Sequence, residues 1–381
     1  MNMKRYMIMA ALAVLASCSP KAMQKTTENG SELGFSVDFI RHALQVSDPD
    51  ENLSVSPYSA GVAMSMLTEG EDGETKAELD DALNGCLFTT ADLGSNDTVR
   101  ITSANSVWLD NDFAVRNEYV SHMQKEYDAL ATVLSFSDPA TVKAINEWCA
   151  EHTDGMIKGI VSRLDPDMKM ILANALYFNA EWAKTFNAGL TKPGVFHGAK
   201  GDTDISFMYK KDYYGYAEYY GNQLIELPYR TGRYAMYILL PAADMNVHDV
   251  VSYLYESGVK EVMGLLERRQ VNLKMPKFKV ETDVSLVKTF EAMGVRTAFT
   301  PAADLSGIAR GPLAVSDVLQ KTVVEVNEKG TVAAAVTSVM VGLTSAQPEK
   351  PANMYIDRPF VYMIADMEQE RILFAGKIMN L

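Results

Sequence analysis

Residues 328–350 have the sequence Glu-Lys-Gly-Thr-Val-Ala-Ala-Ala-Val-Thr-Ser-Val-Met-Val-Gly-Leu-Thr-Ser-Ala-Gln-Pro-Glu-Lys. Solvated linkers usually carry charge, Gly or Pro throughout. This stretch is instead small, almost uncharged and alternating, with the period of a β-strand. One side of such a strand would hold Thr331, Ala333, Ala335, Thr337, Val339 and Val341. An exposed segment with the pattern of a buried strand indicates a chain that can change where this segment sits.

The composition of the whole chain limits its function. At 381 residues and 48% hydrophobic content, the chain can bury a large core. Its net charge of −14 argues against nucleic acid as a partner, because that partner needs a basic face. The common zinc-protease, Cys-x-x-Cys, dinucleotide, P-loop and lipase signatures are absent. We therefore expect no metal, no cofactor and no enzyme activity, with a hydrolase as a distant third alternative.

The N-terminus has the pattern of a targeting segment. Lys4 and Arg5 precede an apolar run, residues 6–16, that fits a signal-peptide core but is too short to span a bilayer. The sequence Leu-Ala-Ser-Cys at 15–18 resembles the bacterial lipobox, in which the Cys is acylated. We expect a signal peptide at 1–17, then lipidated Cys18 and a flexible tether at 18–30. The protein would be exported and lipid-anchored to a bacterial (outer) membrane, periplasmic or at the cell surface. An ordinary cleaved signal is the alternative.

Periodicity predicts helices first and strands later, which favours an α+β fold. Helices are expected at 34–45, from Ser56-Pro57 through 67, and at 74–83. Cys149 lies in a further helical pattern, and the sequence leaves open whether it forms a disulfide with Cys86. Strands are expected at 170–178, 224–227, 234–240, 271–280, 322–326, 361–365 and 371–378. Asn174 interrupts the first of these strands, so it should join a polar cluster.

Several sequence blocks carry a further signal: Asn52–Ser59, Gly73–Glu78, Asn174–Trp182, Met275–Phe278, Gly294-Val295, Ala303–Ser306, Val324–Thr331, Arg358–Phe360 and Leu373–Lys377. Together they resemble the serpin family, over residues 31–381. One such block would be weak evidence, but this many in family order is specific. The resemblance implies three β-sheets, about nine helices and an exposed reactive loop at 328–350.

In function, the resemblance implies a suicide-substrate inhibitor of serine endopeptidases. A protease cleaves the loop, which then inserts into the central sheet and traps the acyl-enzyme. The hinge would comprise Glu328, Gly330, Thr331, Ala333, Ala334 and Ala335. Gly330 would give backbone freedom, and the small residues would enter a packed sheet without strain. The alternative is a non-inhibitory serpin acting as a surface binding protein.

The cleaved bond follows from the family spacing. Seventeen residues counted from Glu328 end at Thr344, so the bond would be Thr344–Ser345, with Leu343–Thr344 as the alternative. No Lys or Arg lies between Gly330 and Glu349, whereas a trypsin-like pocket requires a cation. Elastase-, subtilisin- and chymotrypsin-like proteases are therefore the expected targets, with papain-like cysteine proteases as a further class.

Supporting residues also follow from the resemblance. Shutter and breach positions, where the central strands must part, correspond to Ser56, Ser59, Asn174, Trp182 and Gln320. Helix capping by Ser56 is compatible with this role, and an ordinary core tryptophan is the alternative for Trp182. Gln320 stands where the family usually has His, so gating should depend less on pH. Lys277 and Glu328 match a family ion pair near the hinge. We expect a monomer that acts on target proteases.

Overall fold

The computed structural model describes residues 31–90, 93, 95–251, 258–331 and 350–381. The expected signal peptide, Cys18 and the tether lie outside these residues. So do Ala333, Ala334, Ala335, Leu343, Thr344 and Ser345. Among the described residues, no helix combines the length and apolar character needed to cross a membrane.

The helices follow the expected caps. Ser31 accepts a hydrogen bond from the Gly34 amide and so begins the first helix, and Ser56 with Pro57 begins the second. The α-helices with defined bounds are α2 Glu32–Val46, α3 Pro57–Thr68, α4 Gly73–Ala82, α5 Asn117–Tyr127, α6 Ala140–His152, α8 Val259–Met263 and α9 Val287–Ala292. Short 3₁₀ helices are η2 Ala188–Leu190 and η3 Thr297–Phe299. Every residue of α3 is buried, as its apolar sequence predicts.

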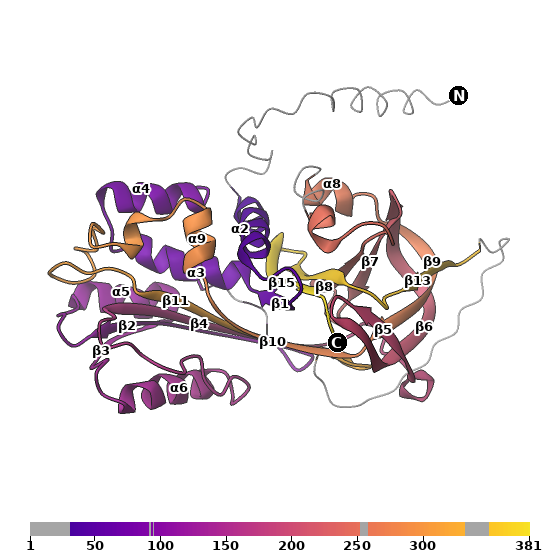
Figure 1. The fold of residues 1–381 in the computed structure, drawn as a ribbon, viewed down its shortest axis with the longest axis horizontal. Helices are drawn as coiled ribbons and strands as arrows, with labels where there is room; N and C mark the ends of the chain where they lie inside the picture. The colour runs from indigo at the N-terminus through magenta and orange to yellow at the C-terminus, as the bar shows by residue number, and fades with distance from the viewer. Residues whose placement is uncertain (1–30, 91–92, 94, 252–257, 332–349) are drawn as a thin grey trace, which may run out of the picture.

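A six-stranded sheet forms the centre of the molecule. Its strands, in spatial order, are β10 Phe278–Ser285, β11 Asp317–Val326, β12 Gly330–Thr331, β4 Met170–Glu181, β2 Val99–Asp110 and β3 Leu130–Leu134. Figure 1 shows α3 on one side of this sheet and α6 on the other. The sheet is therefore covered on both faces, which explains why β4 is apolar along nearly its whole length.

A nine-stranded sheet contains the other strands. Their order is β1 Leu53–Val55, β15 Arg371–Ile378, β14 Phe360–Asp366, β8 Tyr234–Leu240, β7 Asn222–Pro228, β6 Gly201–Tyr219, β9 Glu267–Pro276 and β13 Ala352–Tyr355, with β5 Lys192–Gly198 also on β6. Three sheets were expected, but hydrogen bonding joins the described strands into two. The cause is β6, which pairs with β5 and β9 and, at its end, with β7. The α+β class is confirmed.

One expected strand is divided between the two sheets. The sequence predicts a single strand at 271–280, but β9 ends at Pro276 and β10 begins at Phe278. Lys277 lies at the crossing, where its amide donates to the Ser206 carbonyl at 2.9 Å. Apolar alternation continues through the crossing because both strands are half buried, so the pattern alone does not show the change of sheet.

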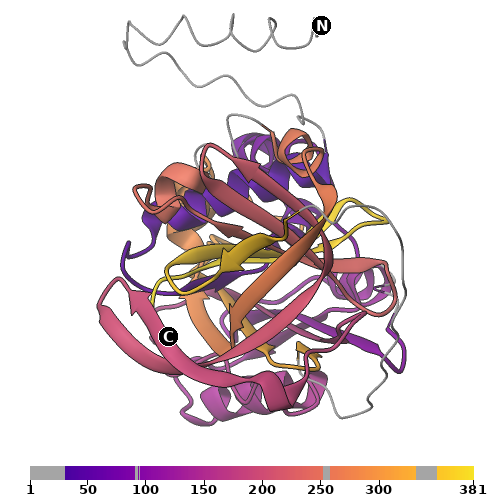
Figure 2. The same cartoon turned by 90° about the vertical axis from the view of Figure 1, so that its right-hand side faces the viewer.

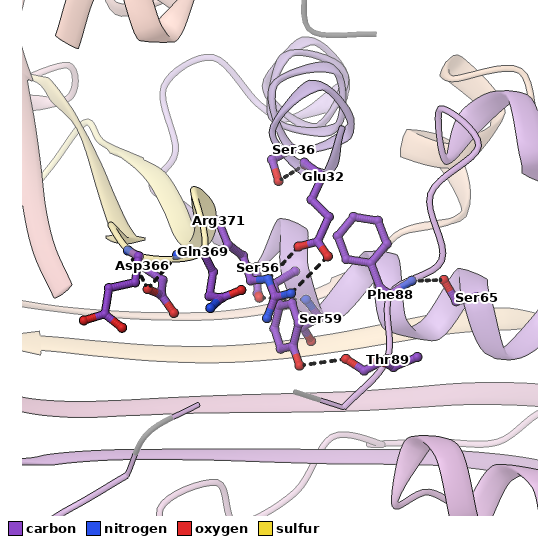
Figure 3. Close-up of polar contacts among 12 residues, drawn as sticks. Glu32, Ser36, Ser56, Ser59, Ser65, Phe88, Thr89, Asp366, Gln369 and Arg371 are labelled. Atoms are coloured by element: carbon purple, nitrogen blue, oxygen red, sulfur yellow. Dashed lines mark hydrogen bonds and ion pairs between the residues drawn. The ribbon is translucent and has the colours of Figure 1, made fainter. Parts of the chain in front are cut away.

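A bidentate ion pair ties the first helix to the C-terminal strands. The Arg371 guanidinium donates to both Glu32 carboxylate oxygens, at 2.6 and 3.0 Å, and its carbon lies 4.7 Å from the centre of the Tyr58 ring (Figure 3). The Arg371 side chain is only 8% exposed. The contact with the Tyr58 ring places this pair beside the start of α3. The pair thus braces the helix start on which the candidate site is built.

Candidate functional site

The candidate site is the seam between β4 and β11. The two strands run parallel from the Asp317–Ile171 pair to the Val323–Tyr177 pair. Beyond that point β12 lies between them, with Thr331 opposite Ala180 on one side and opposite Val326 on the other. The first two residues of the expected inserting segment are therefore already a strand of the central sheet.

Gly330 is required for close packing. The φ angle of Gly330 is not positive, so glycine is not needed here for the backbone freedom that the sequence suggests. A Cβ there would lie 2.0 Å from the Ala180 carbonyl oxygen and 2.8 Å from the Glu181 Cα. Only glycine allows the chain to approach β4 this closely.

Thr331 is anchored by an aromatic residue that the sequence analysis missed. Thr331 is fully buried, and its hydroxyl lies 2.7 Å from the Tyr229 hydroxyl. The Tyr229 ring stacks on Trp182, with centroids 4.6 Å apart and planes at 10°. Burial raises the pKa of Tyr229 far above its usual value, so this group stays a neutral phenol. Tyr229 lies between the strands expected at 224–227 and 234–240, and no local sequence signal marks it as a hinge contact.

The turn before β12 is held by backbone and ionic contacts. The Trp182 indole donates to the Asn327 carbonyl at 3.0 Å, and its amide donates to the Lys329 carbonyl at 2.8 Å. Lys277 and Glu328 form an ion pair at 3.0 Å, and the Thr191 hydroxyl donates to Glu328 at 2.7 Å. Trp182 therefore holds the turn that leads into β12.

The pKa of Glu328 is lowered. Burial alone would raise it, but the hydrogen bonds from Thr191 and Lys277 favour the carboxylate and outweigh that effect. Glu328 is therefore charged at neutral pH and keeps its bonds to both partners.

The polar residues at the shutter positions separate into two groups. Gln320 accepts from the Ser56 amide at 2.8 Å and donates to the Ser56 carbonyl at 2.9 Å, so it is tied to the start of α3. Ser56 also caps α3 by accepting from the Ser59 amide at 3.1 Å. Gln320 and both serines are fully buried.

Asn174 belongs to the second group. It lies opposite Gln320 across the seam, yet its amide donates to the Asn105 side chain on β2. Within the described ranges, no hydrogen bond joins Asn174 to Gln320, and the Asn174 Oδ1 has no partner. β4 and β11 can therefore part without breaking a side-chain hydrogen bond between these two amides. Asn105 was missed in the sequence, although a polar residue in a buried strand is the signal that would have found it.

Both described cysteines are free thiols. Cys149 is buried in α6 and Cys86 is partly buried, so the disulfide left open by the sequence is not formed. Burial raises the pKa of Cys149 to about 11, which keeps it protonated and unreactive at neutral pH.

Comparison with known proteins gives the same family for the whole domain. The family model for "Serpin (serine protease inhibitor)" matches residues 31–381. An uncharacterized serpin-like protein from Methanosarcina mazei is 33% identical over 353 residues, which cover 88% of this chain and 82% of the relative. Iripin-3 from Ixodes ricinus is 33% identical over 400 residues, which cover 98% of this chain and 99% of the relative.

Solved structures share the fold. The native state of tengpin, a thermophilic serpin, matches with a TM-score of 0.84 and 28% identity, and the match covers 96% of each chain. Human thyroxine-binding globulin complexed with thyroxine matches with a TM-score of 0.82 and 22% identity. The match covers 92% of this chain and 98% of the globulin, and it shows the fold alone. The family match, the relatives and the arrangement of β4, β12 and β11 agree, and the chain belongs to the serpin family.

Proposed function

We propose that this chain is a suicide-substrate inhibitor of serine endopeptidases with small or apolar primary pockets. Elastase-, subtilisin- and chymotrypsin-like enzymes are its targets, with papain-like cysteine proteases as a further class. Members of the serpin family are generally protease inhibitors. The single observation that carries the proposal is β12, because a strand already begun between β4 and β11 gives the rest of the loop a register to follow.

The register of β12 indicates where the inserted loop would lie. Thr331 faces Ala180 in an antiparallel pair, so each residue further along the loop pairs one residue earlier on β4. Residues 333, 335 and 337 would then lie opposite Phe178, Leu176 and Asn174. These β4 residues are fully or almost fully buried, and Phe178 and Leu176 belong to the main core. Small residues at 331, 333, 335 and 337 fit that face without overpacking.

Insertion would also give the Asn174 Oδ1 a hydrogen-bond donor. Residues directly opposite in a sheet have Cβ atoms about 5 Å apart, so a Thr337 hydroxyl can reach the Asn174 Oδ1. That oxygen has no partner in the described chain. A buried acceptor that gains a hydrogen bond contributes about 1–3 kcal/mol. The inserted state would therefore be favoured by this contact as well as by new backbone pairing.

In the proposed reaction, the protease nucleophile attacks the Thr344 carbonyl and releases the Ser345 amine, which leaves an acyl-enzyme. Thirteen residues, 332–344, would extend β12 by roughly 43 Å as a strand. The bound protease is carried with Thr344 and distorted before water can hydrolyse the ester. Because 330–349 holds no Lys or Arg, trypsin-like proteases are poor targets.

A denaturing gel tests the proposal. The protein is incubated with an elastase, a subtilisin and trypsin, and a covalent complex with either of the first two is the expected result. Mass spectrometry of the released C-terminal peptide identifies the cleaved bond, expected to be Thr344–Ser345. Cleavage without complex would instead support a non-inhibitory serpin that acts as a surface binding protein.

We further propose that the inhibitor is exported and lipid-anchored through Cys18. The charged start, the apolar run and the lipobox-like residues 15–18 support this location. Metabolic labelling with a fatty acid should mark the wild type and leave Cys18→Ser unlabelled. Labelling of both proteins, or of neither, would contradict the anchor.

A further inference from the structure

The solvent face of β6, β9 and β13 has an unusual composition. β6 pairs antiparallel with β9, and β9 pairs parallel with β13, so their side chains form cross-strand rows. Figure 2 faces the end of the molecule where these strands lie. The two rows nearest the end of β13 consist of Tyr209, Lys274 and Tyr355, then Lys211, Asn272 and Asn353. Tyrosine, amide and lysine side chains fill both rows, and neither contains a carboxylate.

An open groove of about 420 Å³ runs along these rows. Its lining includes Leu190, Tyr209, Lys211, Asn272, Lys274 and Tyr355. Leu190 and Tyr355 are about half exposed, at 48% and 47%. The groove thus offers exposed apolar surface together with hydrogen-bond donors, which is the composition of a protein-binding surface.

Two cations on this face, Lys211 in the groove and Arg268 further along β9, have no carboxylate partner among the described residues. Lys274 is paired with Asp357 at 3.0 Å, but Lys211 and Arg268 are exposed and form no such pair within the described ranges. The Arg268 guanidinium lies 4.6 Å from the centre of the Tyr213 ring, which holds it on this face. The row of Arg268 also contains Glu226, across Gly215. In a chain with a net charge of −14, the two rows nearest the end of β13 are nonetheless a local reversal of sign. Such a reversal attracts an acidic partner.

The groove lies within reach of the proposed cleavage site. β13 begins at Ala352, eight residues after Thr344, so chain length alone limits their separation to about 28 Å. A protease domain of about 230 residues is roughly 45 Å across. A protease bound at Thr344 therefore comes close enough to contact this face.

We propose that the face formed by Lys211, Arg268, Tyr213 and Tyr355 binds an acidic surface segment of the captured protease. This inference rests on the proposed function and adds a second determinant of target choice to the loop sequence. Carboxylates of the segment pair with Lys211 and Arg268, and its aliphatic parts pack on the two tyrosines. Two unpaired cations suit one or two carboxylates, whereas a sulfated polysaccharide needs a longer cationic track.

Binding to an inactive protease isolates this docking step. Two elastase-like proteases, one acidic and one basic, are used with the catalytic serine changed to alanine. The test variant is Lys211→Glu with Arg268→Glu. The control is Lys143→Glu with Lys288→Glu, which makes the same change in net charge at exposed sites on α6 and α9. The acidic protease should bind the test variant at least tenfold more weakly than the wild type at 50 mM salt, and this difference should shrink at 300 mM. The control should stay within twofold of the wild type.

Two results would overturn the inference. One is equal affinity of wild type and test variant for the acidic protease. The other is heparin binding that is lost in the test variant while protease binding is unchanged, which would make the face a polysaccharide site. Active protease separates this inference from the proposed function. If docking depends on this face but the wild type forms no covalent complex with active protease, the proposed inhibitory function is wrong and the proposed docking surface is supported.

Discussion

Replacing Thr331 with arginine should convert the proposed inhibitor into a substrate. The wild-type side chain is fully buried between β4 and β11 and bonded to Tyr229. An arginine cannot occupy that site without burying an unpaired charge, which costs several kcal/mol even after relaxation. In the uncleaved protein, β12 should leave the sheet and the turn at 327–329 should stay in place.

The size of the effect follows from competition between insertion and deacylation. If the buried charge adds about 3 kcal/mol to the insertion barrier, insertion slows roughly 150-fold. A wild type that traps about 95% of the protease it meets would then trap only about one molecule in ten. Thr331→Ser keeps the hydroxyl and loses one methyl group, so it should trap nearly as well as the wild type.

Titration of a subtilisin- or elastase-like enzyme measures this directly. The number of inhibitor molecules consumed per enzyme inactivated should rise about tenfold for Thr331→Arg. A denaturing gel should show the cleaved chain in place of the covalent complex. Urea denaturation of the uncleaved variant checks that the remaining fold is intact. A folded variant that still forms the complex with wild-type stoichiometry would refute the reasoning, because loop insertion would then not require entry at Thr331.

Three further outcomes follow from particular contacts. Burial raises the pKa of Glu71 to about 8, and neither of its oxygens has a partner in the described chain. The folded state then holds this proton more tightly than the unfolded state does, so stability falls as pH rises from about 4.5 to 8. Glu71→Gln should raise the unfolding free energy at pH 8.5 by roughly 3 kcal/mol and have little effect at pH 5, as measured by urea denaturation. If the pH profile of stability is the same in the variant and the wild type, Glu71 does not have this raised pKa. Glu32→Ala should lower the unfolding free energy by about 2–4 kcal/mol, because it leaves the Arg371 guanidinium largely buried and unpaired. A loss below about 1 kcal/mol in the same assay would show that the ion pair is dispensable. Thr337→Val should leave the stability of the uncleaved protein unchanged but lower the melting temperature of the cleaved form, because the Asn174 Oδ1 would then lack a hydrogen-bond donor. Equal melting temperatures of the cleaved variant and the cleaved wild type would argue against the inserted register.

Much of the fold could be predicted because its signals are local. Apolar periodicity and the Ser56-Pro57 cap locate α3, and the nearly unbroken apolar run locates β4. The change of sheet at Lys277 could not be predicted in this way, because strands in both sheets present the same alternation. The β2 and β3 strands were also missed. Most of β2 is buried, but Thr102, Ser103, Asn105 and Ser106 interrupt its apolar pattern, and β3 has five residues that are mostly half buried.

The candidate site likewise combines features that the sequence predicts with contacts that only the tertiary structure shows. The sequence by itself determined the family. It also predicts the hinge spacing, the small residues that can enter a sheet and a loop without cations, which makes trypsin-like proteases poor targets of the proposed inhibitor. Those properties depend on residue type and spacing alone. The tertiary structure decided that Tyr229 anchors Thr331, that Gly330 serves close approach, and that Asn174 and Gln320 bond away from each other. These contacts join residues about 70–260 positions apart. Only the packing of β4 against β2, β11 and β12, and of this sheet against α3 and the turn after β7, brings such residues together.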